Sequence, residues 1–141
     1  MMKRAILMIG ALGAMAAGAG QAQELRVTLQ GVEHERGQLS VGVYAEPKTF
    51  RKERLAYVTK KVPAAAGEVT VVFDALPPGR YAVMAYHDEN GNGELDRRLG
   101  MFPTEGYALS NNPKVMGPPG FDDSAFEVGA QAVHIDLQMR Y

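Results

Sequence analysis

The sequence predicts an all-β protein: an antiparallel β-sandwich of about seven strands, immunoglobulin-like or prealbumin-like, with one long loop system. Three observations lead to this prediction. Short segments alternate between apolar and polar residues, as half-buried strands do. Turn-forming residues rich in Gly, Pro, Asn and Asp separate these segments. Only one short stretch, Lys48–Tyr57, favours a helical turn.

Six segments carry the alternation, and each places its apolar side chains on one face. We expect these faces to form the core between two sheets. Met84 and Tyr86 should face the opposite side of their strand, and "RLAYVTKKV" (54–62) fits either a strand or a short helix. In chain order, the predicted core residues are Leu25, Val27 and Leu29; Leu39, Val41 and Val43; Val69, Val71 and Phe73; Tyr81, Val83 and Ala85; Ala125 and Phe126; and Val133, Ile135, Leu137 and Met139.

A Pro-Pro-Gly turn lies between two of these segments, in "LPPGRYAV" (76–83). Proline presets φ and glycine supplies a positive φ, so the motif indicates a structural hairpin. Tyr81 stands just inside the following strand. A tyrosine at this place often turns its hydroxyl to the backbone at a corner of a sandwich.

Residues 1–22 differ from the rest of the chain. Lys3 and Arg4 are followed by an uncharged run rich in Ala and Gly, and then by small residues, which is the pattern of a cleaved signal peptide. We expect cleavage after Ala22, with Ala19 as the alternative site. The run is short for a membrane span, which needs about 20 strongly apolar residues. Residues 23–141 would then form one domain in the periplasm or outside the cell, with no membrane insertion after cleavage.

Charge and cysteine content exclude some classes of function. Loss of Lys3 and Arg4 leaves 13 basic and 16 acidic residues, a net charge of −3. This weak acidic balance gives no reason to expect a nucleic-acid partner. The chain has no cysteine, which removes both thiol chemistry and disulfides.

The alternation breaks between Asp88 and Phe121, in a stretch rich in Gly, Pro and Asn. Irregular segments longer than about 15 residues are uncommon in compact domains and are usually functional or disordered. Apolar residues recur throughout this one, and we expect Phe121 to pack. We therefore predict an ordered loop system over one end of the sandwich.

This loop system opens with "DENGNGELD" (88–96), which has the spacing of a calcium loop. Calcium binds six to eight oxygens, and an EF-hand takes them from positions one, three, five, seven and nine, with glycine at six. Leu99 occupies position twelve, where an EF-hand has a bidentate Glu, so the loop is not a complete EF-hand. Asp96 or Glu105 could close the site. The candidate ligands are Asp88, Asn90, Asn92, the carbonyl of Glu94, and Asp96.

The alternative is a polar turn. Asn-Gly is a strong turn signal, and it occurs twice here, at Asn90-Gly91 and Asn92-Gly93. Asp and Asn are also recruited to turns for hydrogen bonds to their own backbone. Both interpretations, a calcium loop and a turn, stay open on the sequence alone.

Histidine offers two further hypotheses. His34, His87 and His134 lack the close spacing of zinc ligands, so a zinc site would have to be assembled from distant strands. His87 and Asp88, together with Glu105, could instead act as acid/base groups in a small periplasmic hydrolase or lyase.

Five motifs in order resemble a known family. They are "F-x-x-L-P-P-G-x-Y-A-V" (73–83), "HDENGNGELD" (87–96), "G-x-x-P-x-E-G-Y" (100–107), "SNN" (110–112) and "GPPGFDDSAF" (117–126). Together they resemble the bacterial domain-of-unknown-function family 2141, whose usual E-G-Y-G-F-S reads "EGYALS" here. The resemblance implies an exported β-sandwich similar to transthyretin-like or carboxypeptidase-regulatory-like modules. It implies no established activity.

The leading hypothesis is therefore an exported, non-enzymatic β-sandwich module whose calcium loop organises a surface for a protein or glycan partner. A purely structural envelope protein is a further alternative. Residues proposed to contact the partner are Glu105, Tyr107, Asn111 and Asn112.

Overall fold

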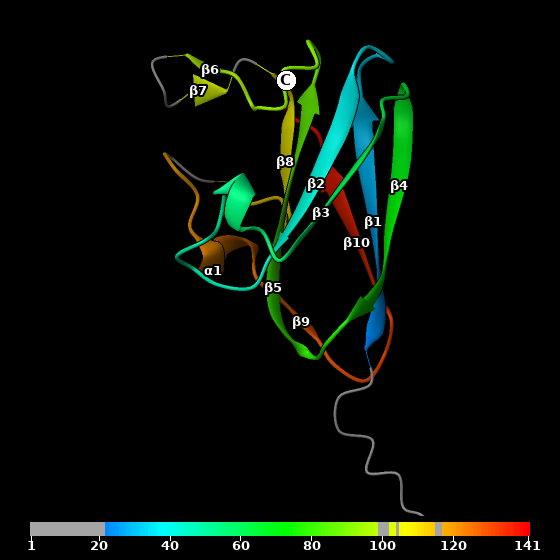
Figure 1. Cartoon of the computed structure of the whole chain (residues 1–141), viewed down its shortest axis with the longest axis vertical. Coiled ribbons are helices and arrows are strands. Elements are labelled where there is room, and N and C mark those ends of the chain that lie inside the picture. The colour runs from blue at the N-terminus through cyan, green and yellow to red at the C-terminus, as the bar shows by residue number, and fades with distance from the viewer. Residues whose placement is uncertain (1–21, 99–101, 104, 115–116) are drawn as a thin grey trace, which may run out of the picture.

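The computed structural model of the chain describes residues 22–98, 102–103, 105–114 and 117–141. The expected signal segment, 1–22, lies outside the described residues except for Ala22. Two β-sheets pack face to face (Figure 1), which confirms the predicted all-β sandwich. Within the described residues, no helix has the length and apolarity that crossing a membrane requires.

The first sheet has the strand order β10–β1–β4. Its strands are β1 (Gln23–Val32), β4 (Gly67–Leu76) and β10 (Val133–Gln138). β4 is antiparallel to β1, but β10 is parallel to it, which departs from the purely antiparallel arrangement expected. Parallel strands cannot be joined by a tight hairpin. Here β1 and β10 are separated along the chain by all of the other strands.

The second sheet has the order β3–β2–β5–β8, and β9 pairs with the first residues of β5. All of these pairs are antiparallel. The strands are β2 (Gln38–Tyr44), β3 (Val58–Pro63), β5 (Gly79–Asp88), β8 (Tyr107–Leu109) and β9 (Phe126–Val128).

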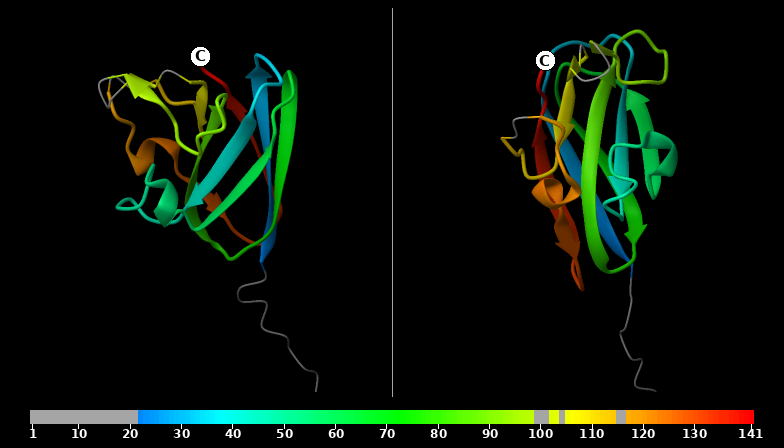
Figure 2. Two further views of the ribbon diagram at one scale, coloured as in Figure 1. Left: turned by 45° about the horizontal axis from the view of Figure 1, so that its top comes forward. Right: turned by 90° about the vertical axis from the view of Figure 1, so that its left-hand side faces the viewer.

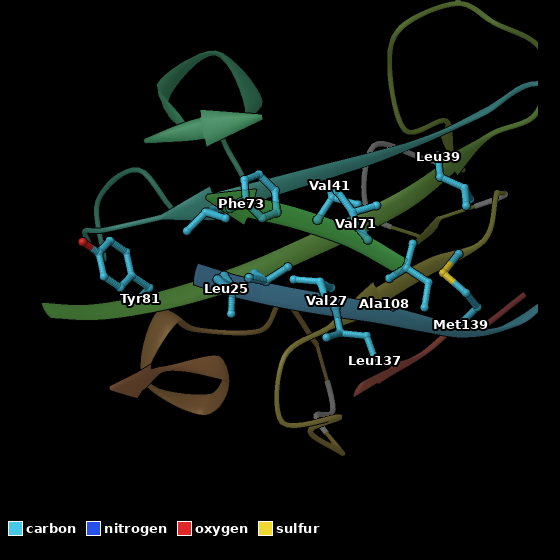
Figure 3. Close-up of a cluster of buried hydrophobic side chains, with 14 of the residues drawn as sticks. Leu25, Val27, Leu39, Val41, Val71, Phe73, Tyr81, Ala108, Leu137 and Met139 are labelled. Atoms are coloured by element: carbon cyan, nitrogen blue, oxygen red, sulfur yellow. The ribbon is translucent and has the colours of Figure 1, made fainter. Parts of the chain in front are cut away.

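The main core lies between the sheets, and Figure 3 shows part of it. The alternation predicted most of its members correctly: Leu25, Val27 and Leu29 of β1, for example, are fully buried. Val69, Val133 and Ile135 are partly buried against the core. Burying a Val, Leu or Phe side chain contributes about 1.5–3 kcal/mol, so this layer dominates the stability of the fold.

The outer face of the second sheet is covered as well, because β5 is buried on both sides from Tyr81 to Asp88. Met84 of β5 packs there with Tyr44 of β2 in a second apolar cluster. Phe50 meets the rings of Tyr44 and Phe121 edge-on, with centroids 5.5 and 6.0 Å apart. The packing predicted for Phe121 is thus confirmed.

The segment expected to be a helical turn, Lys48–Tyr57, contains one 3₁₀ turn, η1 (Glu53–Leu55). The strand interpretation of the next residues is correct, since β3 begins at Val58. Figure 2 shows η1 and the short helix α1 (Phe121–Ser124) on the same side of the sandwich.

The hairpin predicted at Pro77-Pro78-Gly79 is wrong, because β4 and β5 belong to different sheets. The turn is an arch that carries the chain from one sheet to the other. The Tyr81 hydroxyl donates a hydrogen bond to the Pro77 carbonyl at 2.6 Å, which confirms the tyrosine corner. The motif therefore favours a change of sheet as strongly as a hairpin.

The stretch from Asp88 to Phe121 is more regular than predicted. It contains β6 (Arg97–Arg98) and β7 (Phe102–Pro103), which pair with each other. It also contains β8, which is a strand of the second sheet. The all-loop prediction missed β8 because "YAL" is too short to show a period of two. Three apolar residues of this stretch, Leu99, Met101 and Met116, lie outside the described residues.

Candidate functional site

The Asp88–Asp96 loop curls around the carboxylate of Asp88, the last residue of β5. One oxygen accepts the backbone N–H of Asn92 at 3.1 Å, and the other accepts that of Gly93 at 2.8 Å. The side-chain amide of Gln38 donates to the second oxygen at 3.3 Å. Asp88 is completely buried. These hydrogen bonds satisfy the buried carboxylate and hold the loop in its curled conformation.

Asp96, at the far end of the loop, faces two asparagines. The Asn90 and Asn92 side-chain amides each donate to one of its carboxylate oxygens, both at 2.7 Å. These hydrogen bonds, that of Asn92 first, hold the pKa of Asp96 below its usual value. Asp88, Asn90, Asn92 and Asp96, four of the five predicted ligands, therefore lie together.

Glu105 joins the two ends of the loop from outside it. One carboxylate oxygen accepts the N–H of Glu89 at 2.7 Å, and the other accepts the N–H of Asp96 at 3.0 Å. Glu105 is buried, with 6% of its surface exposed. Glu105 therefore holds the two ends of the loop together.

The backbone of the loop needs its glycines. Gly91 and Gly93 have φ values of 70° and 79°, which side-chain-bearing residues rarely adopt. Gly37, in the turn between β1 and β2, also has a positive φ, 74°, and is needed for a second reason. A Cβ there would collide with the backbone carbonyl oxygen of Asp88. The turn and the loop are thus packed backbone to backbone.

The orientation of the Asn90 and Asn92 side-chain amides determines which atoms they would present to a cation. The Asn90 oxygen accepts the N–H of Asn92 at 3.2 Å, and the Asn92 oxygen accepts the N–H of Glu94 at 3.0 Å. Their amide nitrogens therefore occupy the positions nearest Asp96. A calcium ion at Asp96 would require these amides to turn their oxygens inward, because calcium binds oxygen. Glu94 itself has an exposed side chain.

The other residues proposed to contact a partner are tied into the fold. Tyr107 pairs with Tyr86 across β8 and β5 and bridges to Arg140. Asn111 and Asn112 have positive φ values of 66° and 45°. The Asn111 amide donates to the Ala125 carbonyl at 2.9 Å, and the Asn112 oxygen accepts the N–H of Gln138 at 2.8 Å.

The acid/base hypothesis placed His87, Asp88 and Glu105 in one catalytic group. All three are buried, and each is hydrogen-bonded to backbone groups. None of them lines the groove described next. Backbone hydrogen bonds therefore hold these three side chains apart from that groove.

A groove of approximately 1000 Å³ lies over the outer face of the second sheet, and the sequence patterns did not reveal it. Strands β2, β3 and β5 line it, together with the 51–55 segment on one side and the Gly93–Leu95 part of the loop on another. We call it the outer groove. Its lining residues are Ser40, Gly42, Tyr44, Arg51, Lys52, Glu53, Arg54, Leu55, Thr59, Lys61, Met84, Tyr86, Gly93, Glu94 and Leu95.

Tyr86 connects the two walls of the outer groove. Its hydroxyl lies 2.8 and 2.9 Å from the carboxylate oxygens of Glu53 and 2.9 Å from the Gly93 carbonyl. Burial, and then the hydrogen bond to Glu53, raise the pKa of Tyr86 above its usual value. The prediction that Tyr86 faces away from the core was a sequence signal for this contact. Its partner Glu53, however, lies 33 residues away in the 3₁₀ turn η1.

The histidines divide into two groups. The rings of His34 and His87 contact each other at a tilt of 41°, with centroids 4.4 Å apart. His134 lies elsewhere, with its Nε2 2.9 Å from the Thr28 hydroxyl and 3.3 Å from Asp136. Of the three histidines considered as zinc ligands, His34 and His87 therefore lie together and His134 does not.

Of the comparisons with known proteins, the one with family models agrees with the resemblance carried by the sequence motifs. No curated protein and no solved structure matches the chain. A family model described as "uncharacterized protein conserved in bacteria" matches residues 27–136, which span the domain from β1 into β10. The chain belongs to this family, DUF2141.

Proposed function

We propose that the chain is an exported, non-enzymatic binding module whose outer groove takes an anionic glycan and whose Asp88–Asp96 loop binds calcium. One observation carries the proposal: the loop in which four oxygen-bearing side chains converge also forms a wall of the groove. An ion that rigidifies the loop would therefore also fix the shape of the binding surface.

The charge of the groove supports an anionic ligand. Four basic residues, Arg51, Lys52, Arg54 and Lys61, line it against two acidic ones, Glu53 and Glu94. A concave surface lined mostly by one sign of charge attracts ligands of the other sign. Hydroxyl groups and tyrosine rings, which suit sugars, line the same space. This surface stands out because the whole chain is slightly acidic, with a net charge of −1.

Export is supported by the composition of residues 1–22, which have the charged start, apolar run and small residues of a signal peptide. Expression in a bacterium followed by N-terminal sequencing of the periplasmic fraction tests this part. We expect the processed chain to begin at Gln23. An unprocessed chain in the cytoplasm would contradict it.

Calcium binding is tested by thermal melting at increasing calcium concentration. A ligand that binds only the native state raises the melting temperature with its concentration. We expect this rise in the wild type and in Asp74→Asn, whose exposed carboxylate lies on β4, but not in Asp96→Asn. A melting temperature independent of calcium in the wild type would identify the loop as a polar turn.

Ligand binding is tested by calorimetry with heparin-derived oligosaccharides and with neutral dextran oligosaccharides of matched length. We expect salt-sensitive binding of the heparin fragments alone, lost in Arg54→Gln/Lys61→Gln. The control, Arg26→Gln/Lys48→Gln, removes the same charge from exposed positions that do not line the groove. Equal loss in both double variants would mean non-specific attraction. No binding to any oligosaccharide would favour a protein partner or a purely structural envelope role.

A further inference from the structure

A second cluster of metal-ligating side chains lies at the same end of the sandwich, outside the calcium loop's ligand set. His34 comes from the turn between β1 and β2, His87 from the end of β5, and Glu89 from the residues just after it. One ligand atom from each side chain lies within 4.8 Å of the others. His87 is completely buried, whereas the side chains of His34 and Glu89 are 20% and 29% exposed.

The hydrogen bonds of His87 leave its Nδ1 as the coordinating atom. Its Nε2 lies 2.6 Å from the carbonyl oxygen of Arg36, which can only accept, so Nε2 carries the proton. The lone pair is then on Nδ1. A metal-bound histidine typically donates its other ring N–H to a carbonyl or carboxylate, which fixes the ring's orientation and tautomer. His87 is held in that arrangement.

The remaining contacts in the cluster are bonds that an ion could replace. The His34 Nε2 lies 2.6 Å from a Glu89 carboxylate oxygen, and its Nδ1 accepts the N–H of Arg36 at 3.2 Å. The Tyr141 hydroxyl lies 2.7 Å from the His87 Nδ1. One proton therefore stands between His34 and Glu89, and another between Tyr141 and His87. An ion would take the place of these protons. The His34 proton would move from Nε2 to Nδ1, which breaks the hydrogen bond that Nδ1 accepts from the Arg36 N–H, and the Tyr141 hydroxyl would move off the His87 Nδ1.

We propose that His34, His87 and Glu89 bind one zinc ion. Two imidazole nitrogens and one carboxylate oxygen are a donor set that zinc accepts, whereas calcium prefers oxygen ligands alone. With zinc–ligand distances of about 2.0–2.2 Å, tetrahedral ligand atoms lie roughly 3.4 Å apart, so side-chain shifts of about 1 Å close the site. Solvent reaches the cluster from the side of His34 and Glu89, whose side chains are partly exposed.

The experiment titrates zinc chloride into the tag-free, metal-stripped protein by calorimetry, with cobalt(II) absorption as a second readout. We expect one zinc ion per chain and a tetrahedral cobalt spectrum. His34→Gln and Glu89→Gln should each weaken zinc binding at least tenfold, since each removes one of three ligands. His87→Gln is a poor probe because the residue is fully buried, so the two partly exposed ligands carry the test.

Two controls separate this site from others. His134→Gln removes a histidine that lies outside the cluster and should leave zinc binding unchanged. Asp96→Asn should also leave it unchanged, while abolishing any response to calcium. Absence of saturable zinc binding in the wild type would overturn the proposal. So would a loss in His134→Gln equal to that in His34→Gln, or a loss in Asp96→Asn equal to that in Glu89→Gln.

Discussion

The core between the two sheets and the polar end around Asp88 both contain buried side chains, but these are held by different interactions. In the core, side chains such as Leu25, Val27 and Leu137 have no exposed surface and make only apolar contacts. At the polar end, Asp88 and Glu105 are also buried, but each accepts hydrogen bonds from defined backbone N–H groups. Burial is non-directional and scales with area, whereas hydrogen bonds depend on angle and distance.

This difference determines how each region should respond to change. The core should lose stability in proportion to the volume removed, and the loss should be spread over the whole fold. The polar end should lose local order first, because a few carboxylates organise a whole loop. Four measurements test this contrast.

The largest effect is expected in the core. Leu25→Ala should lower the free energy of unfolding by about 2–5 kcal/mol, because it removes buried area and leaves a cavity. Urea denaturation measures the change. Leu55→Ala is the matched control, since Leu55 is 54% exposed, and it should change stability by less than about 0.5 kcal/mol. Similar losses at both positions would contradict the location of the core.

At the polar end, Asp88→Ala should lower the free energy of unfolding by about 2 kcal/mol, because it leaves the backbone N–H groups of Asn92 and Gly93 without their acceptor. The loss should be local. Hydrogen exchange should speed up at the amides of Asn92 and Gly93 while those of β1 stay protected. Asp122→Ala serves as control, as its carboxylate is exposed. Uniform loss of protection across both sheets would show that the loop and the core are one cooperative unit.

Tyr81→Phe tests how much a single hydrogen bond at the edge of the core contributes to stability. The change keeps the ring in the core and removes only the hydrogen bond to the Pro77 carbonyl, so we expect a loss of about 1 kcal/mol. Tyr57→Phe is the control, because Tyr57 is 53% exposed. A neutral Tyr81→Phe would mean that the ring alone holds the arch between the sheets.

The smallest effect is a pH dependence at the outer groove. Burial and Glu53 raise the pKa of Tyr86 above the unfolded value of 10.0. The stability that this group contributes is therefore fully present below pH 10 and declines as pH rises through the folded pKa. Unfolding free energies measured across this range should fall less steeply in Tyr86→Phe than in the wild type. Identical slopes would contradict the raised pKa.

The sequence predicted the core well because its signal is local. Alternation in β1, β2 and β5 follows from the geometry of a strand and from the need to bury one face. The features it missed depend on contacts between distant residues. β8 is three residues long, and nothing in "VHIDLQ" distinguishes a parallel from an antiparallel partner.

The candidate sites follow the same rule. The convergence of Asp88, Asn90 and Asp96 was predictable because nine consecutive residues contain it. The outer groove was not, since Glu53 and Tyr86 are 33 residues apart. The His34–Glu89 contact joins residues 55 apart and depends on a turn whose length no pattern encodes.

The parallel pairing of β1 with β10 has a consequence for how the chain reaches this structure. Thr28 and His134, neighbours across that pair, are 106 residues apart in the chain. Topologies dominated by such distant pairings fold slowly, in about milliseconds to seconds. Before β10 docks, one edge of β1 is unpaired. An unpaired edge can pair with a strand of another chain. We therefore expect the docking of β10 to complete the fold, and the protein to be most prone to aggregation before β10 docks.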